Sequence, residues 1–273
     1  MSQEILRPLN LTEALQFLAA HQPHARIVNG ATDLPHEIAH GVRAPQTLID
    51  IRLVPDLKFI REAGDFVQLG ASVTHAHVLA SPLLAARALP LVRACQLIRD
   101  PQARERGTIA GNVAGALSTN LTIAALWAMG AQVVLKSVRG ERLVTFNEFF
   151  KGVRQTAMLA DEMVYAIAFS KMSDKDRGAF VATGWSREDA QANVTCAVVL
   201  EFEGDEISNA WITLGGVAPT VVNAVEAEQA LVGQWLNDAA IDQAAELAMN
   251  VVVTDPDKIE TVRVLVTQAL REI

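Results

Sequence analysis

The stretch RERGTIAGNVAG, residues 104–115, contains three glycines at intervals of four residues. This spacing would suit a closely packed helix, but each glycine costs a helix about 1 kcal/mol relative to alanine, so we expect a loop instead. Without side chains at Gly107 and Gly111, backbone N–H groups can approach a diphosphate, and Thr108 and Asn112 can add side-chain hydrogen bonds. The stretch therefore predicts a site for a dinucleotide. It does not predict a Rossmann site, because the pattern G-x-G-x-x-G is absent.

A second candidate anion site lies near the N-terminus, in ARIVNGATDLP at residues 25–35. The apolar residues 25–28 predict a buried strand, the small residues NGA after them predict a tight turn, and Asp33 followed by Pro35 predicts the start of a helix. A strand, a small-residue turn and a helix N-terminus together favour anion binding. The apolar residues 48–51 predict a further strand, which would complete a small βαβ-like unit.

His36, Glu37 and His40 match the zinc metalloprotease pattern H-E-x-x-H, in which the histidines bind zinc and the glutamate activates water. Pro35 and Gly41 restrict the predicted helix to about two turns, and no third ligand occurs at a characteristic spacing. We therefore interpret the three residues as surface residues of a short helix. A zinc hydrolase that uses them is a remote alternative.

Charge and hydropathy argue against two classes of function. The chain has 273 residues, of which 51% are hydrophobic and 20% charged, and its net charge of −8 argues against binding to nucleic acid. No segment approaches the ~20 uncharged apolar residues of a membrane span, and no export signal is recognisable, so we expect a cytoplasmic protein with no membrane span.

The isolated Cys95 and Cys196 cannot hold an iron–sulfur cluster or a zinc ion from this chain alone.

Short strands and helices alternate along the chain, which predicts an α+β fold. The polar, non-periodic residues 172–176 indicate a boundary between two domains, 1–172 and 173–273. The first domain is expected to divide into subdomains of about 1–55 and 56–172.

In the second domain, residues 195–202 and 207–214 predict two strands joined by a hairpin. Three stretches with apolar residues at helical intervals follow them. We therefore expect a small antiparallel sheet and a helical bundle.

Several motifs resemble those of one protein family. The residues GTIAGNVA at 107–114 resemble the "TIGGN" FAD-pyrophosphate motif of the flavin subunits in the xanthine dehydrogenase and carbon monoxide dehydrogenase family of molybdenum hydroxylases. PQARER at 101–106 is similar to the family's "PQIRNRGT" lead-in, and VNGATDL at 28–34 resembles its first pyrophosphate loop, "AGGTDL". Segments 149–162 and 185–220 continue the likeness in the same order.

The resemblance implies a two-lobed FAD-binding domain of the vanillyl-alcohol-oxidase (PCMH) type, followed by the small antiparallel sheet and helical bundle. Non-covalent FAD would lie between the lobes. Two residues, Ile98 and Leu159, are implied to line the flavin. The other residues implied to hold FAD lie in or next to the two loops: Asn29, Gly30, Ala31, Thr32, Asp33, Thr108, Ala110, Gly111, Asn112 and Asn120.

Three positions depart from the family pattern. Ala31 and Ala110 stand where the family has glycine, and an alanine permits such a loop only where φ is negative. Leu121 stands where the family has an aspartate that helps to hold the cofactor, and Asn120 is the candidate substitute. We expect FAD binding to survive these changes in a weaker form.

The resemblance implies an oxidoreductase subunit that holds FAD and carries no catalytic residue for the substrate. A partner subunit with two [2Fe–2S] clusters would supply electrons, a molybdenum-cofactor large subunit would hydroxylate the substrate, and NAD, a quinone or oxygen would accept the electrons. The family usually forms a dimer of three-subunit units, a heterohexamer. The alternative is a family member that has lost FAD and acts as a structural or assembly subunit.

Overall fold

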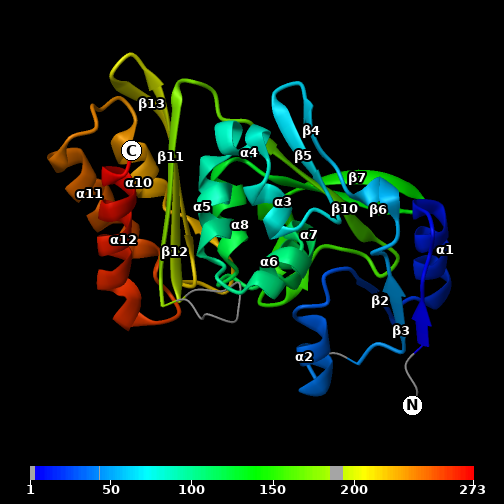
Figure 1. Cartoon of the computed structure of the whole chain (residues 1–273). Helices are drawn as coiled ribbons and strands as arrows, with labels where there is room; N and C mark the ends of the chain where they lie inside the picture. Colours follow the sequence, from blue (N-terminus) through cyan, green and yellow to red (C-terminus); the bar gives the residue numbers. More distant parts are fainter. Residues whose placement is uncertain (1–3, 43, 185–192) are drawn as a thin grey trace.

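The computed structural model describes residues 4–42, 44–184 and 193–273, which form three α/β units in a row (Figure 1). The N-terminal unit lies at one end, and the C-terminal helices lie at the other. The sheet of the N-terminal unit is parallel, with the strand order β1-β3-β2. Its elements are β1 (Glu4–Leu6), α1 (Leu11–His21), β2 (Ala25–Val28), α2 (Leu34–Ala39), β3 (Thr47–Asp50) and the 3-10 turn η1 (Pro55–Leu57).

The middle unit contains an antiparallel sheet of order β4-β5-β10-β6-β7. The helices of residues 75–128 lie between this sheet and the C-terminal sheet (Figure 1). The elements are β4 (Ile60–Ala63), β5 (Phe66–Gly70), α3 (His75–Leu79), α4 (Pro82–Arg87), α5 (Leu89–Leu97), α6 (Pro101–Arg106), α7 (Ile109–Gly115), α8 (Leu121–Ala128), β6 (Gln132–Ser137), β7 (Gly140–Thr145), α9 (Phe146–Phe149), β8 (Phe150–Gly152), β9 (Gln155–Thr156) and β10 (Met163–Ser170).

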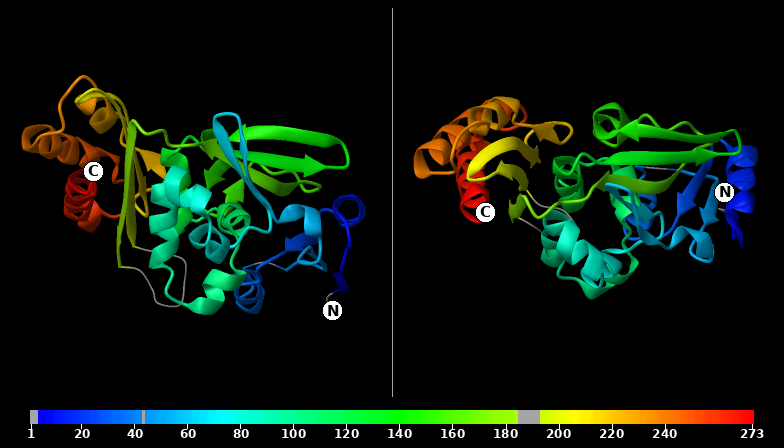
Figure 2. Two further views of the ribbon diagram at one scale, coloured as in Figure 1. Left: turned by 45° about the horizontal axis from the view of Figure 1, so that its top comes forward. Right: turned by 90° about the horizontal axis from the view of Figure 1, so that it is seen from above.

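The C-terminal unit is an antiparallel sheet of order β11-β12-β13-β14 that carries helices on both faces (Figure 2). Helices α5 and α8 pack on one face, and α10 and α12 pack on the other. Side chains of β12 alternate accordingly, since Ala197 and Val199 join the core of the middle unit whereas Cys196 and Val198 join the C-terminal core. The elements are β11 (Asp176–Thr183), β12 (Val194–Glu203), β13 (Glu206–Gly215), β14 (Val222–Asn223), α10 (Val225–Leu231), α11 (Asp238–Ala248), η2 (Met249–Val251), η3 (Pro256–Lys258) and α12 (Ile259–Arg271).

The expected α+β architecture is confirmed. The β2-α2-β3 unit and the β12–β13 hairpin are both present, and the latter precedes the helical bundle. Strand β10 ends at Ser170 and β11 begins at Asp176, on either side of the expected boundary at 172–173, and the division into domains there stays a prediction. Among the described residues, no helix is long and apolar enough to cross a bilayer.

Two buried threonines lie on the face of the C-terminal sheet towards α8, and we expect their replacement by valine to have different effects on the free energy of unfolding. Thr213 Oγ1 donates to Ala124 O at 2.7 Å, whereas Thr195 Oγ1 is buried without a hydrogen-bond partner in the described part of the chain. Thr213→Val is expected to lower the free energy of unfolding by about 1 kcal/mol, because it removes the hydrogen bond from Thr213 to the Ala124 carbonyl. Thr195→Val is expected to leave it unchanged or to raise it by about 1 kcal/mol. Urea unfolding followed by tryptophan fluorescence measures both, and equal losses would contradict the assignment.

Candidate functional site

The prediction of a loop through residues 107–115 was wrong. Helix α7 covers Ile109–Gly115, and only Gly107 and Thr108 separate it from α6. Thr108 caps α7, since its Oγ1 accepts a hydrogen bond from the N–H of Gly111 at 3.0 Å. The penalty for glycine holds for an exposed helix, whereas α7 is largely buried and its glycines permit close contacts. A Cβ on Gly115 would lie 3.3 Å from Asn120 Nδ2.

The two predicted anion-binding segments lie against each other. A Cβ built on Gly30 would lie 2.2 Å from the carbonyl oxygen of Arg106 and 3.1 Å from the Cα of Gly107. Only a residue without a side chain fits here, because both neighbours are backbone atoms. The turn after β2 is therefore in contact with the junction between α6 and α7, although about 75 residues separate them along the chain.

A third segment, residues 71–75, holds both of these segments in place. Asn29 Nδ2 donates to Ala71 O at 3.1 Å and to Ser72 Oγ at 2.9 Å. Three residues further on, the N–H of His75 donates to Gly107 O at 3.1 Å, and the N–H of Ile109 donates to Val73 O at 2.9 Å. The carboxamide of Asn29 thus anchors the turn after β2 to the middle unit.

Ala31 has φ +52°, so the expectation of a negative φ at the alanines fails at this position. The left-handed conformation costs an L-residue about 1–2 kcal/mol, and glycine escapes that cost. Ala110, in contrast, lies in the first turn of α7, where alanine is well suited. Thr32 and Asp33 are exposed just before α2, and Asp33 O accepts the first helical hydrogen bond from the N–H of Glu37.

Asn112 and Asn120 are buried and joined to each other. Asn120 Nδ2 donates to the backbone carbonyl of Asn112 at 2.7 Å, and Asn112 Oδ1 accepts from the hydroxyl of Thr122 at 2.5 Å. Leu121, which stands at the position of the family's aspartate, has no exposed surface and belongs to the main core. The first turn of α8 therefore supports α7 through side-chain hydrogen bonds and offers no carboxylate.

Ile98 and Leu159, the two residues implied to line the flavin, differ in exposure. Ile98 ends α5 and is 1% exposed within the core, whereas Leu159 is 49% exposed. Leu159 is held by Glu162, whose Oε2 accepts from the backbone N–H of Leu159 at 2.7 Å. Glu162 also forms a two-pronged ion pair with Arg142 of β7, at 2.7 and 2.8 Å, and this contact depresses the pKa of the carboxyl group.

The contribution of Glu162 to the free energy of unfolding is expected to depend on pH. Because the folded pKa lies below the ordinary value of 4.5, the stabilisation is complete above that value and is lost as pH falls through the folded pKa. Glu162→Gln is expected to lower the free energy of unfolding by about 2 kcal/mol at pH 7, and the difference from the wild type should shrink steadily below about pH 4. Urea unfolding at pH 7, 5, 4 and 3 measures it. A difference that stays constant to pH 3 would contradict the ionic contact.

His75 and Cys95 form a buried neutral pair beneath Gly107. Cys95 Sγ lies 3.6 Å from His75 Nδ1, and the imidazole ring would contact a Cβ on Gly107 at 3.0 Å. Burial lowers the pKa of His75 to about 4 and raises the pKa of the Cys95 thiol far above its ordinary value. At neutral pH the pair therefore carries no charge, and its role is to pack beneath the junction of α6 and α7.

The zinc hydrolase interpretation finds no support in the geometry. The carboxylate of Glu37 is buried and forms an ion pair with Arg154, so it is not free to activate water. Within the described ranges, no group of three or more His, Cys, Asp or Glu residues is placed to hold a metal ion.

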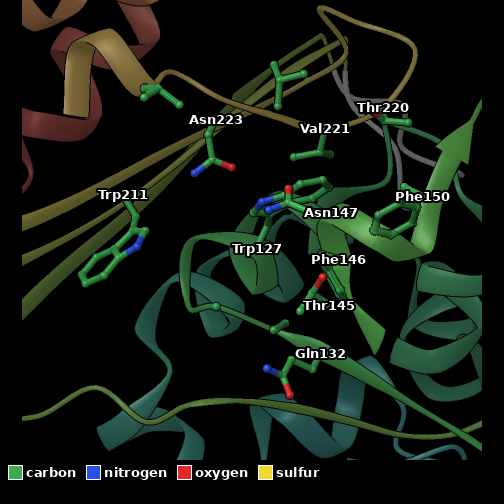
Figure 3. A pocket seen from close by; sticks show the side chains of 14 residues that line it. Trp127, Gln132, Thr145, Phe146, Asn147, Phe150, Trp211, Thr220, Val221 and Asn223 are labelled. Atoms are coloured by element: carbon green, nitrogen blue, oxygen red, sulfur yellow. The ribbon is translucent and has the colours of Figure 1, made fainter. Parts of the chain in front are cut away.

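A separate groove of about 670 Å³ lies between the middle and C-terminal units (Figure 3). Trp127, Phe146 and Phe150 line it on one side, and Trp211 and Asn223 line it on the other. Trp127 is near the C-terminal end of α8, whereas Asn120 directly precedes its N-terminal end. The groove is therefore distinct from the segments around Gly30 and Gly107.

The residues around α7 suit an anionic dinucleotide. The first turn of α7 contains no acidic residue, and a helix N-terminus favours negative charge. Two of its N–H groups are used, because Ile109 donates to Val73 O and Gly111 donates to Thr108 Oγ1. The N–H of Ala110 makes no hydrogen bond to the described residues and is left for a ligand. Gly30 lets the turn after β2 lie directly against the backbone of Arg106 and Gly107, so the turn and the start of α7 are brought together, and the donor set fits the diphosphate of FAD.

Three features define the class of protein: the parallel β1-β3-β2 unit, the antiparallel middle sheet and the small-residue turns between them. The class is a two-lobed dinucleotide-cofactor protein with an appended C-terminal sheet. A family model described as "FAD binding domain in molybdopterin dehydrogenase" matches residues 1–170, and one described as "CO dehydrogenase flavoprotein C-terminal domain" matches residues 183–270.

Known proteins agree with the family match. The carbon monoxide dehydrogenase medium chain of Hydrogenophaga pseudoflava is 31% identical over 89% of this chain and 84% of that protein. The nicotine 6-hydroxylase medium subunit of Paenarthrobacter nicotinovorans is 30% identical over 88% of this chain and 83% of its own length. The solved structure of carbon monoxide dehydrogenase from H. pseudoflava superposes with a TM-score of 0.93 at 31% identity, over 99% of this chain and 96% of that one.

The chain therefore belongs to the FAD-binding flavoprotein subunits of the molybdenum-containing dehydrogenases and hydroxylases. Its cofactor is FAD, its class is oxidoreductase, and its fold is the two-lobed FAD domain with the flavoprotein C-terminal domain. The resemblance identified from the motifs is confirmed.

Proposed function

We propose that this chain transfers electrons through FAD held between the turn after β2 and the first turn of α7. The contact of Gly30 with the backbone of Arg106 and Gly107 carries the proposal, because it brings both segments together. The residues proposed to hold FAD in and beside these segments are those expected from the sequence: Asn29, Gly30, Ala31, Thr32, Asp33, Ile98, Thr108, Ala110, Gly111, Asn112, Asn120 and Leu159.

The roles of these residues differ according to their contacts. Asn29 and Asn120 use their amide groups to position backbone, whereas the N–H of Ala110 is available to the diphosphate. Leu159 is exposed on a segment anchored by Glu162, and Ile98 supports the site from within the core. Bound FAD supplies the ability to exchange single electrons with metal clusters and to deliver two electrons to an acceptor.

We propose that the electrons come from a [2Fe–2S] small subunit and that a molybdenum-cofactor large subunit carries out the substrate chemistry. Both cysteines of this chain are buried and lie on separate elements, so they do not supply the relay. The proposed acceptor is NAD, a quinone or oxygen, the proposed location is the cytoplasm, and the proposed assembly is a dimer of three-subunit units. Carbon monoxide dehydrogenase and nicotine 6-hydroxylase, the relatives named above, support this arrangement through their medium chains.

Reduction of the bound flavin by the partner subunit tests the proposal. The FAD-loaded chain is mixed anaerobically with the reduced cluster subunit, and the visible flavin bands are followed in time. Bleaching of those bands supports electron transfer into this chain. A chain that holds FAD and is not reduced by its assembled partner would contradict the proposal, and a chain that assembles without FAD would support the structural-subunit alternative.

The two alanines are expected to affect stability in opposite directions. Ala31→Gly relieves the left-handed strain of the folded chain, so we expect the free energy of unfolding to rise by roughly 1 kcal/mol. Ala110→Gly is the matched control, because glycine in the first turn of α7 should lower the free energy of unfolding by about 1 kcal/mol. Urea unfolding of the FAD-free chains measures both. Equal effects of the two substitutions would contradict the strained backbone at Ala31.

A further inference from the structure

Arg154 joins three parts of the molecule that are far apart in the chain. It lies in the tight turn between β8 and β9 with φ +58°, a conformation that residues other than glycine rarely adopt. Its backbone N–H donates to Ala116 O at 2.8 Å, and its guanidinium forms an ion pair with Glu37 of α2. The interaction with Glu37 spans 117 positions of sequence.

The two contacts of Arg154 lie on opposite lobes. Ala116 is the C-terminal cap of α7, itself left-handed at φ +49°, and belongs to the middle unit. Glu37 belongs to α2, which begins directly after the turn that contains Gly30 and Ala31. In Figure 1, α2 lies below α6 and α7 and away from the sheet of its own unit. Contacts with the middle unit therefore help to determine the position of α2.

The Arg154–Glu37 ion pair is partly shielded from water. The side chain of Glu37 is 9% exposed and that of Arg154 is 34% exposed. Shielding strengthens the attraction relative to a surface pair and makes the loss of either partner costly. The left-handed backbone at Arg154 is a further cost that the surrounding contacts must offset, which is common where a residue is held for function.

We propose that the Arg154–Glu37 ion pair is a positioning contact for FAD, which holds α2 and the preceding turn, residues 30–33, against the C-terminal end of α7. This inference rests on the proposed placement of FAD between these two segments. A turn that is fixed before the cofactor arrives loses less conformational freedom on binding, so affinity increases without any contact between Arg154 and FAD. Arg154 is thus a positioning residue and not a ligand.

The test separates positioning from general stability. The double variant Glu37→Gln/Arg154→Gly removes both charges of the ion pair and relieves the strained φ at position 154. We expect the FAD-free double variant to melt at or above the wild-type temperature, while FAD binds about tenfold more weakly. Arg154→Lys, which keeps the charge, should fall between the wild type and the double variant. A purely structural role predicts that melting temperature and affinity fall together.

The exposed ion pair between Glu260 and Arg263 on α12 provides the matched control, because Glu260→Gln/Arg263→Gln removes a similar pair away from both lobes. This control should bind FAD like the wild type. Fluorescence titration with FAD and thermal unfolding of the FAD-free chains are measured in parallel. If the wild type binds FAD and the Glu37/Arg154 double variant binds it equally well, the positioning role is overturned. If the wild type itself takes up no FAD, the proposed function fails instead.

Discussion

Gly30→Ala is expected to weaken FAD binding by about 100-fold, because displacement of a binding group by about 1 Å can cost that much. The new Cβ would lie 2.2 Å from Arg106 O, and a backbone carbonyl cannot rotate away as a side chain does. The turn after β2 and the junction of α6 and α7 must therefore separate. The same overlap should lower the free energy of unfolding by about 2 kcal/mol.

Gly204→Ala is the control for Gly30→Ala. Gly204 lies in the β12–β13 hairpin at φ +65° with nothing within 4 Å of its Cβ position, so alanine there costs only backbone strain, about 1 kcal/mol. FAD affinity should stay at the wild-type value. Both variants are titrated with FAD, and wild-type affinity in Gly30→Ala would show that the two segments do not form one site.

Asn112→Asp is expected to weaken FAD binding by about 100-fold or more. The substitution is nearly isosteric, and the new carboxylate can still accept the hydrogen bond from Thr122. Because position 112 is buried, the carboxylate also lowers the free energy of unfolding. The change adds a negative charge beside the proposed diphosphate site, and repulsion between like charges about 5 Å apart reaches about 3 kcal/mol at the edge of a protein. The loss should become smaller at high salt.

Asn237→Asp adds the same charge at a distant position and serves as the control. Asn237 is exposed and caps α11, where an aspartate is an equally good cap, so neither stability nor FAD affinity should fall. Titration at low and high salt compares the two variants. An Asn112→Asp chain that binds FAD like the wild type at low salt would place the diphosphate elsewhere.

Local patterns predicted most of the elements correctly. The strand at Ala25–Val28 and the hairpin of β12 and β13 follow from apolar runs bounded by turn residues, which need no knowledge of distant contacts. Helix α7 was missed because the cost of its glycines was taken from exposed helices, whereas Thr108 and buried contacts stabilise it. Tertiary packing outweighed local propensity there.

Long-range features of the site could not be predicted from one sequence. The contact between Gly30 and Arg106, the anchor of Asn29 on residues 71–72 and the pairing of Glu37 with Arg154 all join distant positions. The positive φ of Ala31 was also unexpected, since alanine ordinarily avoids that region. Arg154 gave no signal at all, because an arginine in a short polar turn is typical of exposed surface.

The visible absorption spectrum of the purified chain, with the cofactor released by acid and identified, tests the central claim most directly. We predict flavin bands, release of FAD in nearly equal ratio to protein, and loss of both when bulky residues replace Gly111 and Asn112 next to the capping Thr108. A colourless chain that takes up no added FAD, alone or with its partner subunits, would contradict the claim. Flavin that remains bound in the Gly111 and Asn112 variants would contradict the proposed position of the site.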